Sequence, residues 1–218
     1  DVHQSDMWYI KNYDLNVMSY ALFHQSSFNV SENFTVTAGL RYDYELSELG
    51  YKYRLERGGS ELSNIDTIYN KLTDNVLLPK LALSYTMNNS TIYTSYTTGY
   101  KPGGFNSTFE EPEHLMFKNE KTHNFELGLK TSMFNKLIYA DIAGFFTRLQ
   151  NQQIYRTVPS GRGAYLDNAG LSENRGGELS IKNTDVLLTI GRNMEGYYMS
   201  FDSIYSRDSI YVNQHGIF

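Results

Sequence analysis

Residues 34–47 alternate apolar and polar side chains without a break. Successive side chains of a β-strand point to opposite faces, so this pattern predicts a strand with one apolar and one polar face. Strands of soluble proteins usually run about 5–6 residues, and this pattern is more than twice as long. A tilted strand that crosses a membrane needs roughly 9–11 residues. The segment therefore fits a strand with lipid on one side and water on the other. The apolar face carries Phe34, Val36, Ala38, Leu40, Tyr42, Tyr44 and Leu46, and the polar face carries Thr35, Thr37, Gly39, Arg41, Asp43, Glu45 and Ser47.

Connections of two lengths join this strand to others that are predicted along the chain. Short polar turns fall at 31–33, 88–90 and 134–136, and long polar loops are expected at 50–74, 101–119 and 151–168. Outer-membrane β-barrels alternate short periplasmic turns with longer extracellular loops. The chain is therefore predicted to be all-β, an antiparallel transmembrane β-barrel of which about 8–10 strands are present.

Composition excludes several classes of protein. The net charge is −5 and the basic residues form no stripe, so a nucleic-acid partner is not expected. Cysteine is absent, which rules out disulfides and thiolate metal sites. No apolar run approaches the roughly 20 residues of a membrane-spanning helix. Tyrosine occurs 19 times, and its apolar ring and polar tip suit membrane interfaces and binding loops.

No group of residues has the spacing of a catalytic or metal site. Gly103 and Gly104 lack the motif of a phosphate-binding loop, and the five histidines are scattered without paired ligand spacing. Asp43 and Glu45 resemble a glycosidase pair only in being two carboxylates, and charged residues that line a wet lumen are the simpler interpretation. We therefore expect no enzyme, no cofactor and no side-chain metal site.

Four segments, in order and correctly spaced, resemble the barrel of TonB-dependent outer-membrane receptors. Residues 20–45 contain a strand, a turn and a returning strand with Gly-Leu-Arg-Tyr, and residues 77–106 contain a Pro-Lys strand and a loop with Gly-Gly-Phe-Asn. Residues 119–146 are similar to the Glu-Leu-Gly hairpin, and residues 167–182 to the Asn-Ala-Gly strand of that family. The Gly-Gly-Phe-Asn loop looks most like the iron-complex, or siderophore, branch.

The resemblance implies energised uptake of an iron-siderophore-type complex across the bacterial outer membrane. Its expected partners are outer-membrane lipid, an iron chelate or other nutrient ligand, and, in the intact parent, a plug domain and the TonB system. Aromatic and Arg side chains suit anionic, planar ligands. The candidate ligand contacts in the long loops are Tyr51, Arg54, Arg57, Tyr100, Lys101, Phe105, Asn106, Arg156 and Arg162. A second set is expected to face the lumen in a structural charge network: Arg41, Asp43, Glu45, Lys80, Glu126, Lys130 and Glu178.

Residues 1–182 are assigned to the receptor barrel, and residues 183–218 to a poorly recognisable β tail in which the alternation decays. Because plug, TonB box and earlier strands are not recognisable, the chain looks like a fragment. An importer of glycans or vitamin B12 from the same family is an alternative. A complete small outer-membrane barrel that acts as an adhesin or structural protein is another, and a soluble β-sandwich is the least favoured because the strands are too long.

Overall fold

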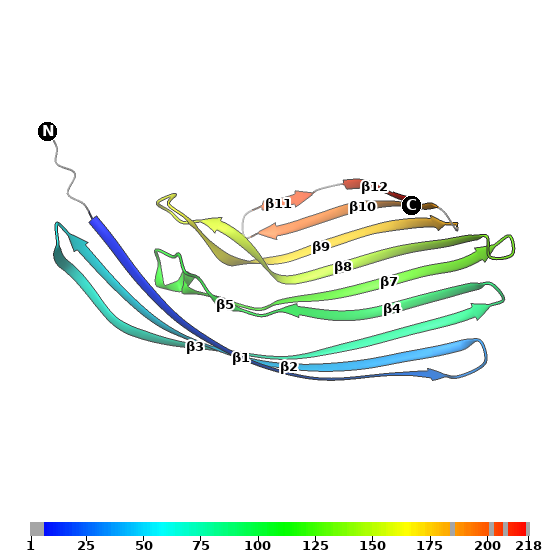
Figure 1. The fold of residues 1–218 in the computed structure, drawn as a ribbon, viewed down its shortest axis with the longest axis horizontal. Helices are drawn as coiled ribbons and strands as arrows, with labels where there is room; N and C mark the ends of the chain where they lie inside the picture. The colour runs from blue at the N-terminus through cyan, green and yellow to red at the C-terminus, as the bar shows by residue number, and fades with distance from the viewer. Residues whose placement is uncertain (1–6, 184–185, 201–202, 207–208, 217–218) are drawn as a thin grey trace.

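Ten strands form a single antiparallel sheet in the computed structural model, which describes residues 7–183, 186–200, 203–206 and 209–216 (Figure 1). The order is β1-β2-β3-β4-β7-β8-β9-β10-β11, with β12 also paired to β10. The first half comprises β1 (Met7–Asn29), β2 (Phe34–Arg57), β3 (Ser60–Met87) and β4 (Ser90–Lys101). The second half comprises β7 (Glu120–Met133), β8 (Ile138–Thr157), β9 (Ala164–Lys182), β10 (Val186–Ser200), β11 (Ser203–Ser206) and β12 (Ser209–Gly216).

The connection between β4 and β7 carries the remaining elements. A small sheet pairs β5 (Gly104–Phe105) with β6 (Met116–Phe117), and the single-turn 3-10 helix η1 (Pro112–Leu115) lies between them. Among the residues that the structure describes, no helix is long and apolar enough to cross a membrane.

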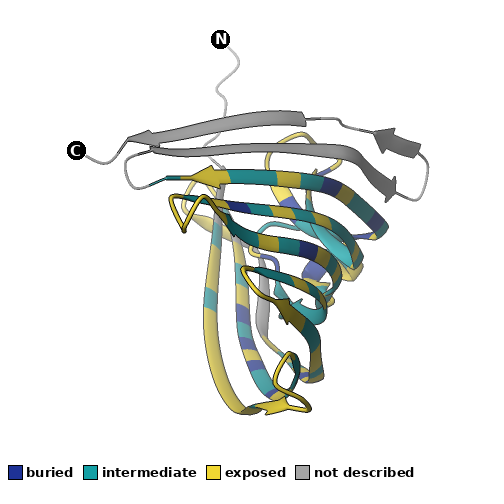
Figure 2. Cartoon of the chain, turned by 90° about the vertical axis from the view of Figure 1, so that its right-hand side faces the viewer, coloured by how far each residue is buried: buried dark blue, intermediate teal, exposed yellow. Residues whose placement is uncertain are grey.

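The period-two pattern of residues 34–47 produces the two faces that it predicts. On β2, Leu40 and Tyr42 are about half exposed, at 49% and 44%, whereas Asp43 is only 5% exposed. Figure 2 shows buried and exposed residues alternating along the strands. Leu40 lies opposite His24 on β1 and Pro79 on β3, so the outer face continues across the sheet.

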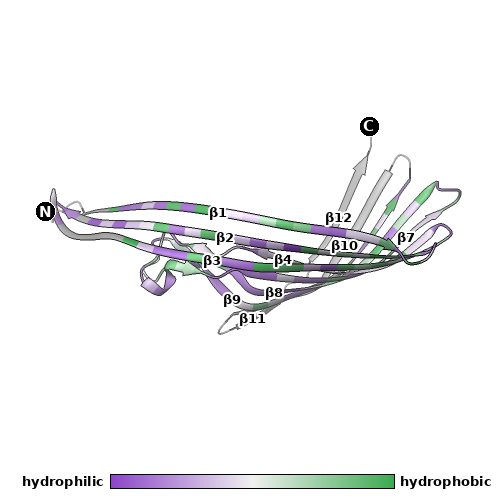
Figure 3. Ribbon diagram, turned by 90° about the horizontal axis from the view of Figure 1, so that it is seen from below, coloured by the Kyte–Doolittle hydropathy of each residue, from purple (hydrophilic) through white to green (hydrophobic). Residues whose placement is uncertain are grey.

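The sheet is curved and open (Figures 2 and 3). Within the described residues β1 pairs only with β2, and β11 and β12 pair only with β10. The fold is thus a partial antiparallel barrel wall, as predicted. Its apolar residues mostly face outward rather than forming a central core.

The short turns lie at one end of the sheet and the longer connections at the other (Figure 1). Turns at 30–33, 88–89 and 134–137 close the first end. Three of these residues, Phe134, Asn135 and Lys136, have positive φ angles of 53°, 56° and 68°, which makes the β7–β8 connection a tight reversal. The predicted positions of the short turns are therefore confirmed.

The prediction of a long loop is wrong at two of the three expected positions, because β-strands continue through both segments. Residues 50–74 form the ends of β2 and β3, which reverse at Gly58 and Gly59 with φ angles of 57° and 80°. Residues 151–168 form the ends of β8 and β9, with a turn at 158–163. Hydrogen bonds between strands do not require an apolar face. Polar segments can therefore form extended hairpins although their sequence lacks the alternation that predicts a strand. Of the three predicted long loops, only residues 101–119 form a loop, which contains β5, η1 and β6.

The tail assignment for 183–218 stays a prediction. Strand β10 pairs with β9 from Leu187–Lys182 to Met199–Leu171, with a register shift between Asn193 and Glu195. Residues 184–185, 201–202, 207–208 and 217–218 of this tail, like residues 1–6, lie outside the described part of the chain.

Candidate functional site

The loop between β4 and β7 bends over the concave face and is bound to strand β3 by Asp74. The Asp74 carboxylate, 8% exposed, accepts the backbone N–H of Gly103 at 2.8 Å and the Asn119 amide at 2.5 Å. The backbone at Gly103 lies so close to Phe117 that a Cβ added at Gly103 would come within 2.6 Å of the Phe117 carbonyl oxygen. Both ends of the loop are therefore tied to one buried carboxylate.

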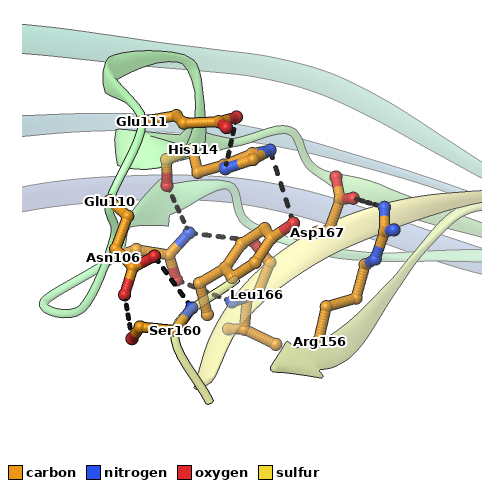
Figure 4. A network of polar contacts seen from close by, with 9 residues as sticks. Asn106, Glu110, Glu111, His114, Arg156, Ser160, Leu166 and Asp167 are labelled. Atoms are coloured by element: carbon orange, nitrogen blue, oxygen red, sulfur yellow. Dashed lines mark hydrogen bonds and ion pairs between the residues drawn. The ribbon is translucent and has the colours of Figure 1, made fainter. Parts of the chain in front are cut away.

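Asn106 ties the middle of the loop to strand β9 (Figure 4). Its side chain is 6% exposed and donates from Nδ2 to the carbonyl oxygens of His114 at 2.9 Å and Leu166 at 2.8 Å. Its Oδ1 accepts the Leu166 N–H at 2.7 Å. Beside it, the His114 ring stacks on Tyr165 with ring centroids 4.3 Å apart. The buried amide is fully used, and so it fixes the loop rather than offering a free contact.

Gln153 and Asn168 bind the loop to the β8–β9 hairpin at a second place. Gln153 Nε2 donates to the carbonyls of Pro102 at 2.7 Å and Lys118 at 3.2 Å. Asn168 accepts the Lys118 N–H at 2.7 Å and donates to the Lys118 carbonyl at 2.9 Å. At the loop tip, Glu110 accepts the Ser160 hydroxyl. The loop is thus held along its length by the strands opposite.

An aromatic cluster fixes the other flank of the loop against β1 and β2. Leu49, Tyr51 and Leu115 are its buried members, and Tyr13, Tyr53, Phe105 and Phe109 pack against them. The ring centroids of Tyr13 and Tyr51 are 5.1 Å apart, and those of Tyr51 and Phe109 5.7 Å. Burial, and to a smaller extent the nearby Tyr51, raises the pKa of Tyr13 to about 12. The Tyr13 phenol therefore stays protonated, and it donates a hydrogen bond to the Ser107 carbonyl.

Three of the predicted ligand contacts are engaged in anchoring this loop. Tyr51 is 6% exposed in the aromatic cluster, and Phe105 packs against that cluster. Asn106 is consumed by backbone hydrogen bonds. For these three residues the structure favours a positioning role over direct ligand contact, because little of each is open to a ligand.

Most other predicted contacts lie exposed and apart at the long-connection end. Arg54 pairs with Glu56 at 2.8 Å, and Arg156 pairs with Asp167 at 2.8 Å. Arg57, Lys101 and Arg162 are exposed, the first and last next to hairpin turns. The structure does not bring these cations into one cluster, and their role in ligand capture stays a prediction.

Among the predicted ligand contacts, Tyr100 differs from the rest because it lies beside the charged residues predicted to face the lumen. It lines a pocket of about 330 Å³ together with Arg41, Asp43, Glu45 and Pro102. Arg41 makes a bidentate ion pair with Asp43, both N–O distances being 2.7 Å, and Glu45 accepts the Ser19 hydroxyl at 3.0 Å. The pocket therefore offers a hydrogen-bond donor beside carboxylate acceptors.

The other residues predicted to face the lumen share the concave face by register. Lys80 lies opposite Gly39 and Thr97, and Glu126 lies opposite Ser95 and Phe145. Glu126 accepts the Tyr93 hydroxyl at 2.8 Å. Lys130 is 3.4 Å from Asp141 and sits over the Tyr93 ring. Glu178, opposite Ala143, completes the set.

Several residues that build the site carry no sequence signal. Asp74, Gln153 and Asn168 contact loop residues 29 to 51 positions away, and Tyr165 contacts His114 at a separation of 51. His114 is one of the five histidines that show no paired ligand spacing in the sequence. With Glu111 and Glu113 it now brings one ligand atom each within 4.8 Å of the others, an arrangement that is common without an ion among exposed acidic groups. The expectation of no side-chain metal site stays a prediction.

The family comparison decides what this curved wall belongs to. A model described as "TonB dependent receptor-like, beta-barrel" matches residues 9–214, nearly the whole chain. The chain belongs to the TonB-dependent receptor β-barrel family. Members of this family are transporters and receptors, and the match confirms the resemblance that the four sequence segments carry.

Solved structures agree on the fold of this TonB-dependent receptor barrel. The ferric yersiniabactin uptake receptor FyuA from Yersinia pestis matches 93% of the chain at 22% identity and a TM-score of 0.67. The siderophore receptor PiuA from Acinetobacter baumannii matches 90% at 20% identity and 0.63. The copper transporter OprC also gives 0.63, at 16% identity over 90% of the chain. The chain covers only 29%, 28% and 33% of these proteins, respectively.

Proposed function

We propose that this chain forms part of the wall of an outer-membrane receptor for energised uptake of an iron-siderophore-type complex. The observation that carries the proposal is the loop 101–119, which is fastened over the concave face beside the Tyr100 pocket. Two of the similar structures are named as receptors for a ferric siderophore or a siderophore. In the full-length protein, a plug domain and TonB would supply the energised step.

The geometry supports capture in two stages. Exposed cations at the long-connection end, among them Arg57 and Arg162, meet an anionic chelate first, because guanidinium groups bind carboxylates and similar oxygens in a planar fork. The Tyr100 pocket lies deeper, where Asp43 and Glu45 make the surroundings acidic. Its part is to hydrogen-bond donor groups of the ligand rather than to attract anionic charge. The fixed loop keeps both stages in register with the lumen.

Growth and uptake of iron test this proposal. The full-length protein is expressed in a strain that lacks its other iron-chelate receptors, and uptake of radioactive iron from a panel of ferric siderophores is measured with and without TonB. We expect TonB-dependent uptake of at least one chelate. Tyr100→Ala should raise the half-saturating concentration about tenfold, which corresponds to about 1.4 kcal/mol. Lys136→Gln, in a short turn at the opposite end, is the matched control and should change nothing.

Two outcomes would contradict the proposal. The first is TonB-dependent uptake of a glycan or vitamin B12 with no iron chelate transported, which would favour the alternative importers of the same family. The second is a correctly inserted protein that supports no TonB-dependent uptake of any ligand in the panel, which would favour a structural or adhesive barrel.

A further inference from the structure

The pocket beside Tyr100 contains a carboxylate that is paired only with a neutral group. The pocket has a volume of about 330 Å³ and is lined by residues of β1 and β2 together with Tyr100 and Pro102. Glu45 lines it from β2, and its Oε2 atom accepts the Ser19 hydroxyl at 3.0 Å. Within the described part of the chain, no lysine, arginine or histidine forms an ion pair with Glu45. Its Oε1 atom is therefore open to a ligand.

The charges around the pocket do not offset that of Glu45. Arg41 also lines the pocket, but it forms a bidentate ion pair with Asp43, with both N–O distances at 2.7 Å. A second carboxylate, Asp74, lies directly opposite Glu45 on β3. Its two oxygens accept hydrogen bonds from neutral groups of the loop 101–119. Like charges that face each other across two strands destabilise a sheet, so a cation bound here would offset an existing surplus of negative charge.

The arrangement suits an organic ammonium group better than a metal ion. A divalent cation binds several oxygen ligands at once. Among the residues that the structure describes, only Glu111, Glu113 and His114 bring three carboxylate or imidazole atoms within 4.8 Å of one another, and none of the three lines this pocket. An ammonium group instead has three N–H donors that can reach separate acceptors. Glu45 supplies a charged acceptor, and the hydroxyl oxygen of Tyr100 in the same pocket supplies a neutral one.

We propose that the Tyr100 pocket binds a protonated primary amine of the transported chelate, with Glu45 as its counter-ion. The inference rests on the proposed uptake function and names the chemical class of its ligand, a ferric chelate with an alkylammonium group outside the iron-binding part. The hydrogen bond from this ammonium to Glu45 is charge-assisted, and such bonds are about twice as strong as neutral ones. A chelate without the amine would cover Glu45 and leave its charge unpaired. Glu45 is therefore a specificity-determining residue.

The same interaction links the ligand to the loop over the pocket. Asp74 holds both ends of the loop 101–119 and lies opposite Glu45. A cation beside Glu45 reduces the repulsion between these two carboxylates, because opposite charges attract at short range. Binding of the amine therefore stabilises the attachment of the loop to β3. Amide hydrogen exchange across residues 102–119 should become slower when an amine-bearing chelate binds.

Isothermal titration calorimetry of the full-length protein in neutral detergent tests the inference. The probe is ferrioxamine B, a linear ferric trihydroxamate that ends in a primary amine, and the comparison is the same chelate with that amine acetylated. We expect the amine form to bind about tenfold more tightly, as for one hydrogen bond to a charged group. Glu45→Gln keeps an acceptor for Ser19 but removes the charge. It should abolish the preference and leave the affinity for the acetylated chelate unchanged, which also shows that the variant is folded.

Glu48→Gln is the matched control, because Glu48 lies on the same strand but on the other face of the sheet. It should keep the full preference for the amine form. Tyr100→Phe should weaken binding of the amine form about threefold, as for the loss of one neutral hydrogen bond. In hydrogen exchange, the amine form should protect residues 102–119 in the parent protein and not in Glu45→Gln.

Equal affinities of the two chelates, binding of neither, or a preference that persists in Glu45→Gln would each overturn the inference. Iron uptake in cells, measured with and without TonB, separates it from the proposed function. TonB-dependent uptake of chelates with no preference for the amine removes the ammonium site and leaves the receptor. A preference in calorimetry without TonB-dependent uptake of any chelate leaves the ammonium site and removes the proposed function.

Discussion

The side chain of Asn106 and the backbone of Leu166 hydrogen-bond to each other in both directions. Asn106 Nδ2 donates to the Leu166 carbonyl at 2.8 Å, and Oδ1 accepts the Leu166 N–H at 2.7 Å. The two residues are 60 positions apart, so this pair joins the loop to strand β9 as an extra strand would. The loop is therefore part of the wall's fixed architecture.

Asn106→Asp should release the loop. The new carboxylate still accepts the Leu166 N–H, but its second oxygen faces the carbonyls of His114 and Leu166, which have no proton to share. We expect a loss of about 1–3 kcal/mol, as for a buried polar group left unsatisfied, and faster amide hydrogen exchange across 102–119. Asn89→Asp, in an exposed short turn, is the control. Unchanged exchange in the Asn106 variant would show that the loop is held by other contacts alone.

Gly128→Ala should destabilise the wall, because the Tyr93 ring lies directly on that glycine. A Cβ at Gly128 would come within 2.5 Å of Tyr93 Cε1. The Tyr93 hydroxyl donates a hydrogen bond to Glu126, and Lys130 lies over the Tyr93 ring. Moving the ring therefore disturbs the lumen network. Overpacking of this kind costs about 1–3 kcal/mol. Gly144→Ala, where space is open, should cost much less, and unfolding of both variants in bilayers should show the difference. Equal stability would refute the close packing.

Leu40 tests whether the convex face lies in lipid. Leu40→Arg should cost about 2–4 kcal/mol if the residue lies near the bilayer midplane. Leu40→Trp should be tolerated, because lipid imposes no fixed packing. On the same strand, Leu49 is 2% exposed in the aromatic cluster, so Leu49→Trp should lose about 1–3 kcal/mol by overpacking. Urea unfolding of the full-length protein in bilayers measures all three. A large loss from Leu40→Trp would place that face against protein instead.

Arg41 shows how far sequence reasoning reaches on the concave face. Period-two spacing puts Arg41 and Asp43 on one face, and the structure joins them by a bidentate ion pair. Asp43 is buried, so Arg41→Leu would leave its carboxylate without that partner. We therefore expect Arg41→Leu to destabilise the wall, which the sequence alone left open.

The strands could be predicted because alternation is local, whereas the loop's contacts could not. The pattern at 34–47 and the three short turns need only neighbouring residues. The hairpins through 50–74 and 151–168 were hidden because polar residues occupy both faces there. The anchoring roles of Asp74 and Gln153 depend on partners 29 and 51 positions away. A single sequence has no periodicity that would reveal such pairs.

The orientation of the wall in the membrane is the claim on which the proposed uptake depends. Because this chain contains no cysteine, single cysteines can be introduced in turn. Ser60, Glu113 and Arg162 are exposed at the long-connection end, and Asn33 and Asn89 are exposed in short turns. Gly59 and Gly161 are not used, because a cysteine would be strained at their positive φ angles, and Phe105 is not used, because it packs against the aromatic cluster.

A membrane-impermeant maleimide applied to intact cells measures that orientation most directly. We predict that cysteines at 60, 113 and 162 react in intact cells, and that cysteines at 33 and 89 react only after the outer membrane is permeabilised. Equal reaction of both sets in intact cells would contradict the account.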